Sequence, residues 1–151
     1  MRKSPLNSLS SIALSVFLWV IVGFIFGGIL SENVDLTNLT IDQWKLRYMS
    51  ITGGGVFLGM IASVLWLILA NDNRPTIKAV INRWNVIFIS TLLLAILLFL
   101  AMVFSDDFQS ISYPYFILLF LSMLITAPGC FWLCSLLFTP EQYKSSVLGQ
   151  R

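Results

Sequence analysis

The sequence has no histidine, and only 11% of its 151 residues are charged, whereas 58% are hydrophobic. Ordinary soluble domains contain about 25% charged residues. A water-soluble chain of this size needs polar side chains to cover its apolar core, and this chain has too few of them. The composition therefore excludes an ordinary soluble domain.

Charged residues are missing altogether from four long stretches, which run over 11–30, 51–70, 86–104 and 115–138. A helix rises about 1.5 Å per residue, so about 20 residues cross a hydrocarbon core of about 30 Å. Four such stretches leave no other part of the chain to bury them. We therefore predict an all-α integral membrane protein, in which residues 1–151 form a single transmembrane four-helix bundle with short loops.

The positions of the basic residues predict the orientation of this bundle. Seven of the nine Lys and Arg fall in the N-terminal segment, the second loop and the tail. Lys and Arg accumulate in loops on the cytoplasmic side of a membrane. We therefore expect both termini in the cytoplasm, with Arg74, Lys78 and Arg83 forming a basic inner surface. The short loops and the plain charge pattern are interpreted as those of a bacterial inner (plasma) membrane protein.

Segments beside the apolar stretches have helical patterns of their own. Thr40 and Gln43 match a capping box, in which each side chain bonds the backbone N–H of the other. The segment 41–49 that follows either lies on the outer interface or extends the second helix, and the sequence leaves both open. The segment 75–84 has an apolar stripe at helical spacing, and we expect it to lie along the inner leaflet. Another capping pattern, starting at Thr139, predicts a short helix in the tail.

Large aromatic residues fall near the expected membrane boundaries. Trp44 and Tyr48 lie at the outer boundary, and Trp66 and Trp84 lie near the inner one. Because amphipathic rings favour the level of the lipid headgroups, this placement supports the assigned depths. Trp19 is the exception, since it falls in the middle of the first stretch, and we expect it to face another helix.

Small residues recur at helical spacing in the first two apolar stretches. Gly23 and Gly27 form a G-x-x-x-G pattern in the first, and Gly55, Gly59 and Ser63 continue the pattern in the second. In lipid, close packing across small residues contributes much of the association between helices. These residues are candidates for helix packing, either inside the four-helix bundle or against another membrane protein.

The fourth apolar stretch is interrupted by Pro128 and Gly129. Proline has no N–H and clashes with the carbonyl four residues earlier, so we predict a kink in the fourth helix. Cys130 and Cys134 lie one turn apart in the same stretch. We interpret them as small buried hydrophobic residues, because a metal site needs more ligands and a reactive thiol needs a base or a cationic neighbour.

The sequence offers no catalytic residues, no metal ligands and no cofactor-binding loop, so we expect a protein that is not an enzyme and has no cofactor. Pumps and proton-coupled transporters keep ionisable groups inside the membrane, and the four stretches have none. Nothing in the modest net charge of +2 indicates a nucleic acid partner. The expected partners are the lipid bilayer and other membrane proteins, or a second copy of the chain.

Three functions remain open. The first is a non-enzymatic structural or accessory subunit of a larger membrane complex of the secretion, conjugation or envelope type, held by helix packing. The second is an immunity or exclusion protein that blocks a pore-forming toxin or a transfer machine inside the membrane. A small channel or transporter is disfavoured by the absence of ionisable groups, although backbone and hydroxyl groups can line a pore.

Overall fold

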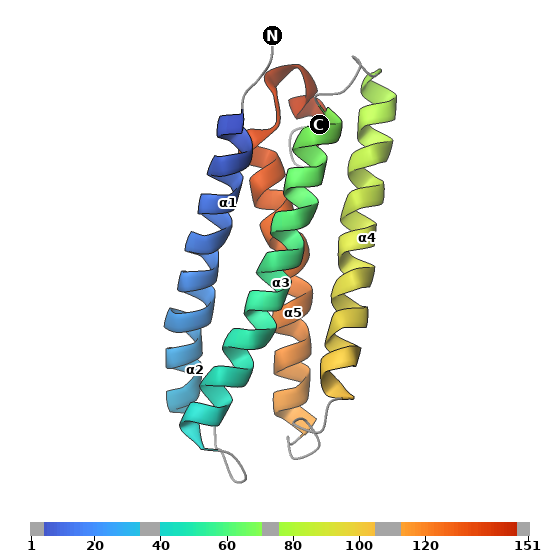
Figure 1. Cartoon of the computed structure of the whole chain (residues 1–151). Helices are drawn as coiled ribbons and strands as arrows, with labels where there is room; N and C mark the ends of the chain where they lie inside the picture. Colours follow the sequence, from blue (N-terminus) through green and yellow to red (C-terminus); the bar gives the residue numbers. More distant parts are fainter. Residues whose placement is uncertain (1–4, 34–39, 71–75, 105–112, 148–151) are drawn as a thin grey trace.

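The computed structural model describes residues 5–33, 40–70, 76–104 and 113–147, and the regular structure in these ranges is entirely helical (Figure 1). Four helices are long and apolar enough to cross a membrane, namely Leu6–Ser31, Ile41–Ala70, Ile77–Val103 and Pro114–Phe138. The prediction of an all-α protein with four such helices is therefore confirmed. The first helix starts, and the last ends, at the same end of the molecule (Figure 1).

The second apolar helix, α3, runs from Ile41 to Ala70 without a break. It therefore includes the segment 41–49, which extends this helix rather than lying apart from it. The predicted capping box is present. The Thr40 backbone N–H donates to Gln43 Oε1 at 3.1 Å, and the Gln43 N–H donates to Thr40 Oγ1 at 3.3 Å. These two bonds fix the start of α3 ten residues ahead of the charge-free stretch.

The separate inner-leaflet segment predicted at 75–84 is not found in the described residues. The third apolar helix, α4, begins at Ile77 and continues to Val103. Its N-cap is Thr76, whose side chain accepts a hydrogen bond from the backbone of Ala79. Two residues of its apolar stripe, Val80 and Trp84, are buried in a core cluster with side chains of α3 and α5, whereas Ile77 is exposed. Packing therefore holds the segment in line with the rest of α4.

The first apolar helix has three parts: the α-helix α1 (Pro5–Trp19), the π-helix η1 (Val20–Phe26) and the α-helix α2 (Gly27–Asn33). A π-helix of this length is uncommon, and no sequence pattern predicted it. Directly before it, the indole nitrogen of Trp19 donates to the Met49 carbonyl oxygen at 3.4 Å. Trp19 thus faces α3, as its position in the middle of the first stretch indicated.

The fourth apolar helix, α5 (Tyr113–Phe138), makes its most extensive contact with α3. The helices α1 and α4 lie on the two flanks of this central pair, and each of them contacts both α3 and α5 (Figure 1). Because α3 and α5 are the most buried helices, side chains that join them decide how the whole molecule packs.

The aromatic residues gather at the two ends of the molecule, as predicted, but inside it rather than on its surface. Trp66 and Trp84 pack with Phe131 at one end, and Trp44 and Tyr48 pack in a second cluster at the other end. All five side chains are buried. These rings therefore contact other helices of the chain, and their depth at the membrane boundaries stays a prediction.

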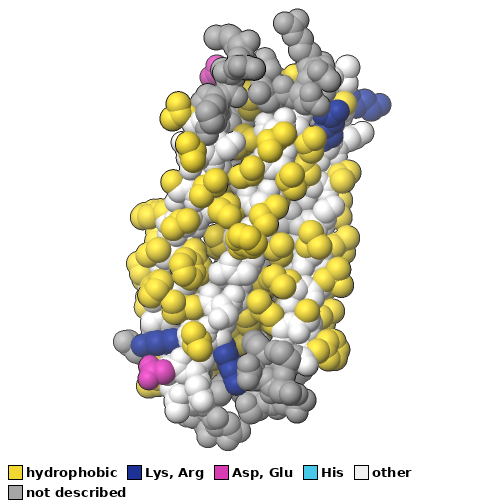
Figure 2. Space-filling view, viewed as in Figure 1, with side chains coloured by type: hydrophobic (Ala, Val, Ile, Leu, Met, Phe, Trp, Pro, Cys, Tyr) yellow, Lys and Arg dark blue, Asp and Glu magenta, His cyan; other side chains and the backbone are white. Residues whose placement is uncertain are grey.

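The surface between the two ends is apolar. Figure 2 shows hydrophobic side chains over the middle of the molecule, whereas basic and acidic side chains are confined to its ends. Among the described side chains, Asp42, Lys45 and Arg47 lie at the end where α3 begins. The opposite end carries Lys78, Arg83, Glu141 and Lys144. An apolar belt with charged ends is the surface that a bilayer requires.

Candidate functional site

The first pair of predicted packing glycines lies against α3. A Cβ added to Gly23 would be 3.6 Å from Thr52 Oγ1, and one added to Gly27 would be 2.9 Å from Cδ1 of Tyr48. Both glycines are buried. The G-x-x-x-G pattern thus allows the first helix to approach α3 within the same chain, so this face is not open to another protein.

The second group of small residues joins α3 to two other helices. Gly55 lies against Thr126 of α5, and a Cβ on Gly59 would be 2.5 Å from the Ala127 carbonyl oxygen and 2.7 Å from the Cβ of Cys130. Ser63, one turn further on, bonds the hydroxyl of Ser11 in α1 at 2.7 Å. The hypothesis that the Gly55 and Gly59 face binds a partner protein is therefore not supported, because α5 already covers this face.

Pro128 lies inside α5 and is buried, whereas the position of a Cβ on Gly129 faces open space. The Thr126 hydroxyl donates to the carbonyls of Ser122 and Met123, at 2.8 and 3.3 Å. The Thr126 hydroxyl therefore does not donate to the Leu124 carbonyl oxygen. That oxygen lacks its usual N–H donor because Pro128 has no N–H. The kink at Pro128 stays a prediction.

The predicted basic surface is described in part. Arg74 lies outside the described residues, and Lys78 is exposed at the start of α4. Nη1 of Arg83 donates to the Leu69 carbonyl oxygen at 3.2 Å. The last carbonyls of a helix have no partner within the helix, so this bond satisfies one of them at the end of α3. Arg83 therefore joins the ends of α3 and α4.

A cluster of three hydroxyls and two thiols joins α1, α3 and α5, and no sequence pattern predicted it. The two thiols lie around the Ser15 hydroxyl, since Cys130 Sγ donates to Ser15 Oγ at 3.3 Å and Cys134 Sγ lies 3.6 Å from the same oxygen. We call this group the hydroxyl–thiol cluster; its members are Ser11, Ser15, Ser63, Cys130 and Cys134. All five are buried. The available signal was the four-residue spacing of the two serines in α1 and of the two cysteines in α5.

Two buried tryptophans donate hydrogen bonds to hydroxyls of α5 and its C-terminal end. Trp66 Nε1 donates to Thr139 Oγ1 at 2.8 Å, and Trp84 Nε1 donates to Ser135 Oγ at 3.0 Å. The Thr139 hydroxyl also donates to the Ser135 carbonyl oxygen. The tail helix predicted after Thr139 is present as the 3-10 helix η3 (Glu141–Ser146), but its N-cap is Pro140, without a side-chain bond. The capping role predicted for Thr139 is wrong, because its hydroxyl is engaged in the core.

We expect Ser135→Ala to lower the stability of the folded protein by about 1 kcal/mol, because it removes the acceptor of a buried indole N–H. The midpoint of detergent-induced or thermal unfolding measures this effect. Ser90→Ala is the matched control, since Ser90 is an exposed serine of α4. A double-mutant cycle with Trp84→Phe isolates the bond. Additive effects of the two substitutions would contradict the assigned interaction.

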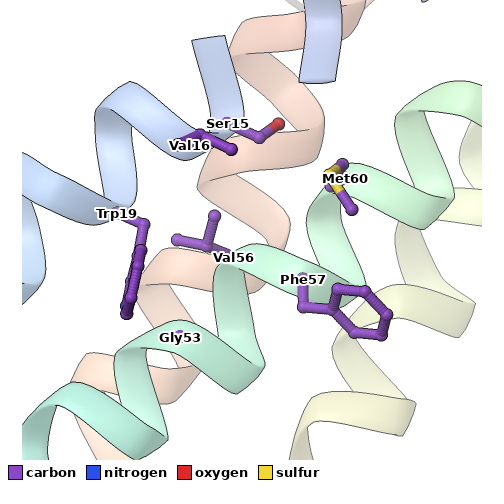
Figure 3. Close-up of a pocket in the computed structure, with 7 residues that line it drawn as sticks. All are labelled: Ser15, Val16, Trp19, Gly53, Val56, Phe57 and Met60. Carbon is purple, nitrogen blue, oxygen red and sulfur yellow. The ribbon is translucent and has the colours of Figure 1, made fainter. Parts of the chain in front are cut away.

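Two apolar grooves flank α3. The groove between α1 and α3 has a volume of about 310 Å³ and is lined by residues that include Val16, Trp19, Gly53 and Phe57 (Figure 3). The groove between α3 and α4 has a volume of about 260 Å³, and Ile61 and Leu65 are among its lining residues. Both grooves are nearly free of polar surface, so they can accept apolar side chains or acyl chains but not a charged ligand.

Comparison with protein families, curated proteins and solved structures gave no match. The chemistry of the site therefore has to be judged from its own residues. Within the described ranges, no three His, Cys, Asp or Glu side chains come together as a group that could hold a metal ion. Trp44 Nε1 is a buried donor with no partner among the described residues. The hydroxyl–thiol cluster and the Trp66 and Trp84 indoles form hydrogen bonds that join helices.

Proposed function

We propose that this protein is a non-enzymatic structural or accessory subunit of a larger membrane complex, of the secretion, conjugation or envelope type. The hydroxyl–thiol cluster and the predicted packing glycines are engaged between helices of the same chain. What the molecule offers to a partner is its apolar outer surface. Recognition by packing of apolar helices, without a chemical step, is the function that fits this surface.

The observation that carries the proposal is a ridge on α3 with a groove on either side. Phe57, Ile61, Leu65 and Ile68 are exposed at helical spacing along α3. We call these four residues the α3 ridge. Helices pack by placing the side-chain ridges of one into the grooves of the other. Phe57 borders the groove between α1 and α3, and Ile61 and Leu65 border the groove between α3 and α4, so the ridge and grooves together supply this relief.

The proposed location is a bacterial inner membrane, with both ends of the chain in the cytoplasm. Lys78, Arg83 and Lys144 lie at the end that we place inside, and Lys45 and Arg47 lie at the other. The full sequence strengthens this asymmetry, since seven of its nine Lys and Arg fall in segments assigned to the inside. The positive-inside rule supports this orientation.

The proposal is tested by purifying a tagged copy, expressed at its native level, in mild detergent and identifying the proteins that accompany it. We expect a stoichiometric set of envelope proteins. Ile61→Trp adds bulk to the α3 ridge and should reduce their recovery roughly tenfold, an effect of about 1.4 kcal/mol. Ile125→Trp makes the same change at an exposed position of α5 and should leave their recovery unchanged.

Recovery of the protein alone would overturn the subunit proposal and favour the immunity or exclusion function. Assays of protection against a toxin or a DNA donor then test that function. Equal recovery of partners with Ile61→Trp and with the unaltered protein would show that the α3 ridge is not the interface. The folded yield of each variant, measured by size-exclusion chromatography, separates loss of binding from loss of folding.

A further inference from the structure

We propose that Cys130 and Cys134 form a binding site for a soft monovalent cation with two-coordinate preference, Cu(I) or its analogue Ag(I). The site is independent of the proposed subunit function. It rests on the arrangement of the hydroxyl–thiol cluster, which brings two sulfur atoms, one hydroxyl and one backbone carbonyl together at the junction of three helices.

The two sulfur atoms lie close enough together to bind a single ion. The cysteines lie one turn apart on α5, and both sulfurs lie within 3.6 Å of the same atom, Ser15 Oγ. A metal–thiolate bond is about 2.3 Å long, so a linear S–metal–S unit needs sulfurs about 4.6 Å apart. The two thiols also share a side-chain hydrogen bond with each other, so the cysteine side chains have to rotate apart to reach that separation when an ion enters between them.

The donor set selects the class of cation. Thiolate sulfur favours soft ions such as Cu(I). Structural zinc sites need four ligands, and magnesium and calcium need oxygen ligands in larger number. The described residues provide two sulfurs here and no His, Asp or Glu beside them. A two-coordinate ion is the one that this pair can satisfy by itself.

Charge balance also favours a monovalent ion. No Asp, Glu, Lys, Arg or His occurs in the described part of α1, η1 or α5, and the thiols pack with Val56, Leu14 and Leu18. A net charge in such surroundings is costly. Binding of Cu(I) with loss of one thiol proton to the solvent gives one thiolate, one thiol and one cation, which is a neutral unit. No electron is transferred in this step.

The serines of α1 position this unit. The Ser15 hydroxyl donates to the Ser11 carbonyl oxygen at 2.8 Å, which leaves its lone pairs directed to the two thiols. The thiol that keeps its proton can therefore donate to Ser15 Oγ while its sulfur binds the ion. Ser15 lies ten residues after the start of α1 at Pro5, or roughly 15 Å along the helix, and Cys134 lies four residues before the end of α5 at Phe138, or roughly 6 Å. The site therefore lies in the half of the molecule that contains these two helix ends.

The test uses the full-length protein in detergent, reduced and kept anaerobic, in competition with a chromophoric Cu(I) chelator. We expect about one Cu(I) per chain to be withdrawn from the chelator. Cys130→Ser and Cys134→Ser should each abolish this competition, since serine keeps the size but not the sulfur. Ser15→Ala keeps both sulfurs and should weaken binding roughly tenfold through loss of positioning.

X-ray absorption at the copper edge of the unaltered protein gives a second readout that needs no variant. Two sulfur neighbours and no nitrogen or oxygen neighbour are expected. The proposal is overturned by coordination through nitrogen or oxygen, by no withdrawal of Cu(I) from the chelator, or by binding that survives in the double variant Cys130→Ser/Cys134→Ser.

Discussion

Gly59→Leu is expected to cause the largest loss of stability among single substitutions in the core. A Cβ at this position would already lie 2.5 Å from the Ala127 carbonyl oxygen, 2.7 Å from the Cβ of Cys130 and 3.1 Å from the Phe131 backbone nitrogen. Two of these three atoms belong to the backbone of α5, which cannot rotate away as a side chain does. Overpacking of a core lowers the free energy of unfolding by about 1–3 kcal/mol. Because the added side chain of Gly59→Leu would meet backbone atoms, we expect its loss of stability at or above the upper end of this range.

The effect is measured as the midpoint of thermal unfolding and as the fraction of monodisperse protein after purification in detergent. Gly28→Leu is the matched control, because nothing lies within 4 Å of a Cβ added to Gly28. Both substitutions remove a glycine from an apolar helix and add the same side chain. Equal stability of the two variants would contradict the close contact between α3 and α5.

Ile125→Asp is expected to prevent stable insertion of the protein, although Ile125 is one of its most exposed side chains, at 69%. On a surface that faces water, an exposed isoleucine can be replaced by aspartate with little effect. In the middle of a membrane-spanning helix, the same aspartate costs about 2.5–3.5 kcal/mol. The amount of Ile125→Asp protein in the membrane therefore shows whether this face of α5 is surrounded by water or by lipid. The amount of full-length protein in the membrane fraction measures the result.

Ile41→Asp provides the matched control for this substitution. Ile41 is also exposed, but it is the first residue of α3, next to the charged side chains at that end of the molecule. We expect wild-type amounts of this variant in the membrane. If Ile125→Asp accumulates to the same level and purifies without detergent, the apolar belt does not face lipid.

The sequence was sufficient to predict the number and approximate place of the four apolar helices. A long stretch without a charged residue indicates a helix surrounded by lipid, so four such stretches predict four membrane-spanning helices. The absence of charged residues does not show where each helix begins and ends. Backbone hydrogen bonding continues beyond the hydrocarbon layer, so α3 begins at Ile41 and α4 at Ile77, although charged residues follow close behind. The capping box at Thr40 was the better guide to where α3 begins.

The contacts between helices were predictable only in part. Small residues such as Gly27 and Gly59 mark a face that allows close approach, but spacing along one helix does not say which helix approaches. The same limit applies to Trp66 and Trp84, whose positions near the ends of the apolar stretches fit an interfacial ring as well as a buried donor. Their acceptors, Thr139 and Ser135, lie 73 and 51 residues away in the chain, and only the fold brings them together.

The hydroxyl–thiol cluster illustrates the same limit for the candidate site. Cys130 and Cys134 were interpreted as buried hydrophobic residues because no base or further ligand is near them in sequence. Ser11 and Ser15 reach them from a helix more than a hundred residues away. A chemical environment made by three helices has no local sequence pattern, and a polar side chain at four-residue spacing in an apolar helix is the nearest available signal.

The measurement that tests the account most directly is the labelling of single introduced cysteines by a membrane-impermeant maleimide in intact cells. Asp42→Cys and Lys78→Cys place exposed thiols at opposite ends of the molecule, while Cys130 and Cys134 are buried and should stay unlabelled. We expect Asp42→Cys to react in intact cells and Lys78→Cys to react only after the membrane is permeabilised. Reaction of both positions in intact cells would contradict the assignment of α3 as a helix that crosses the membrane.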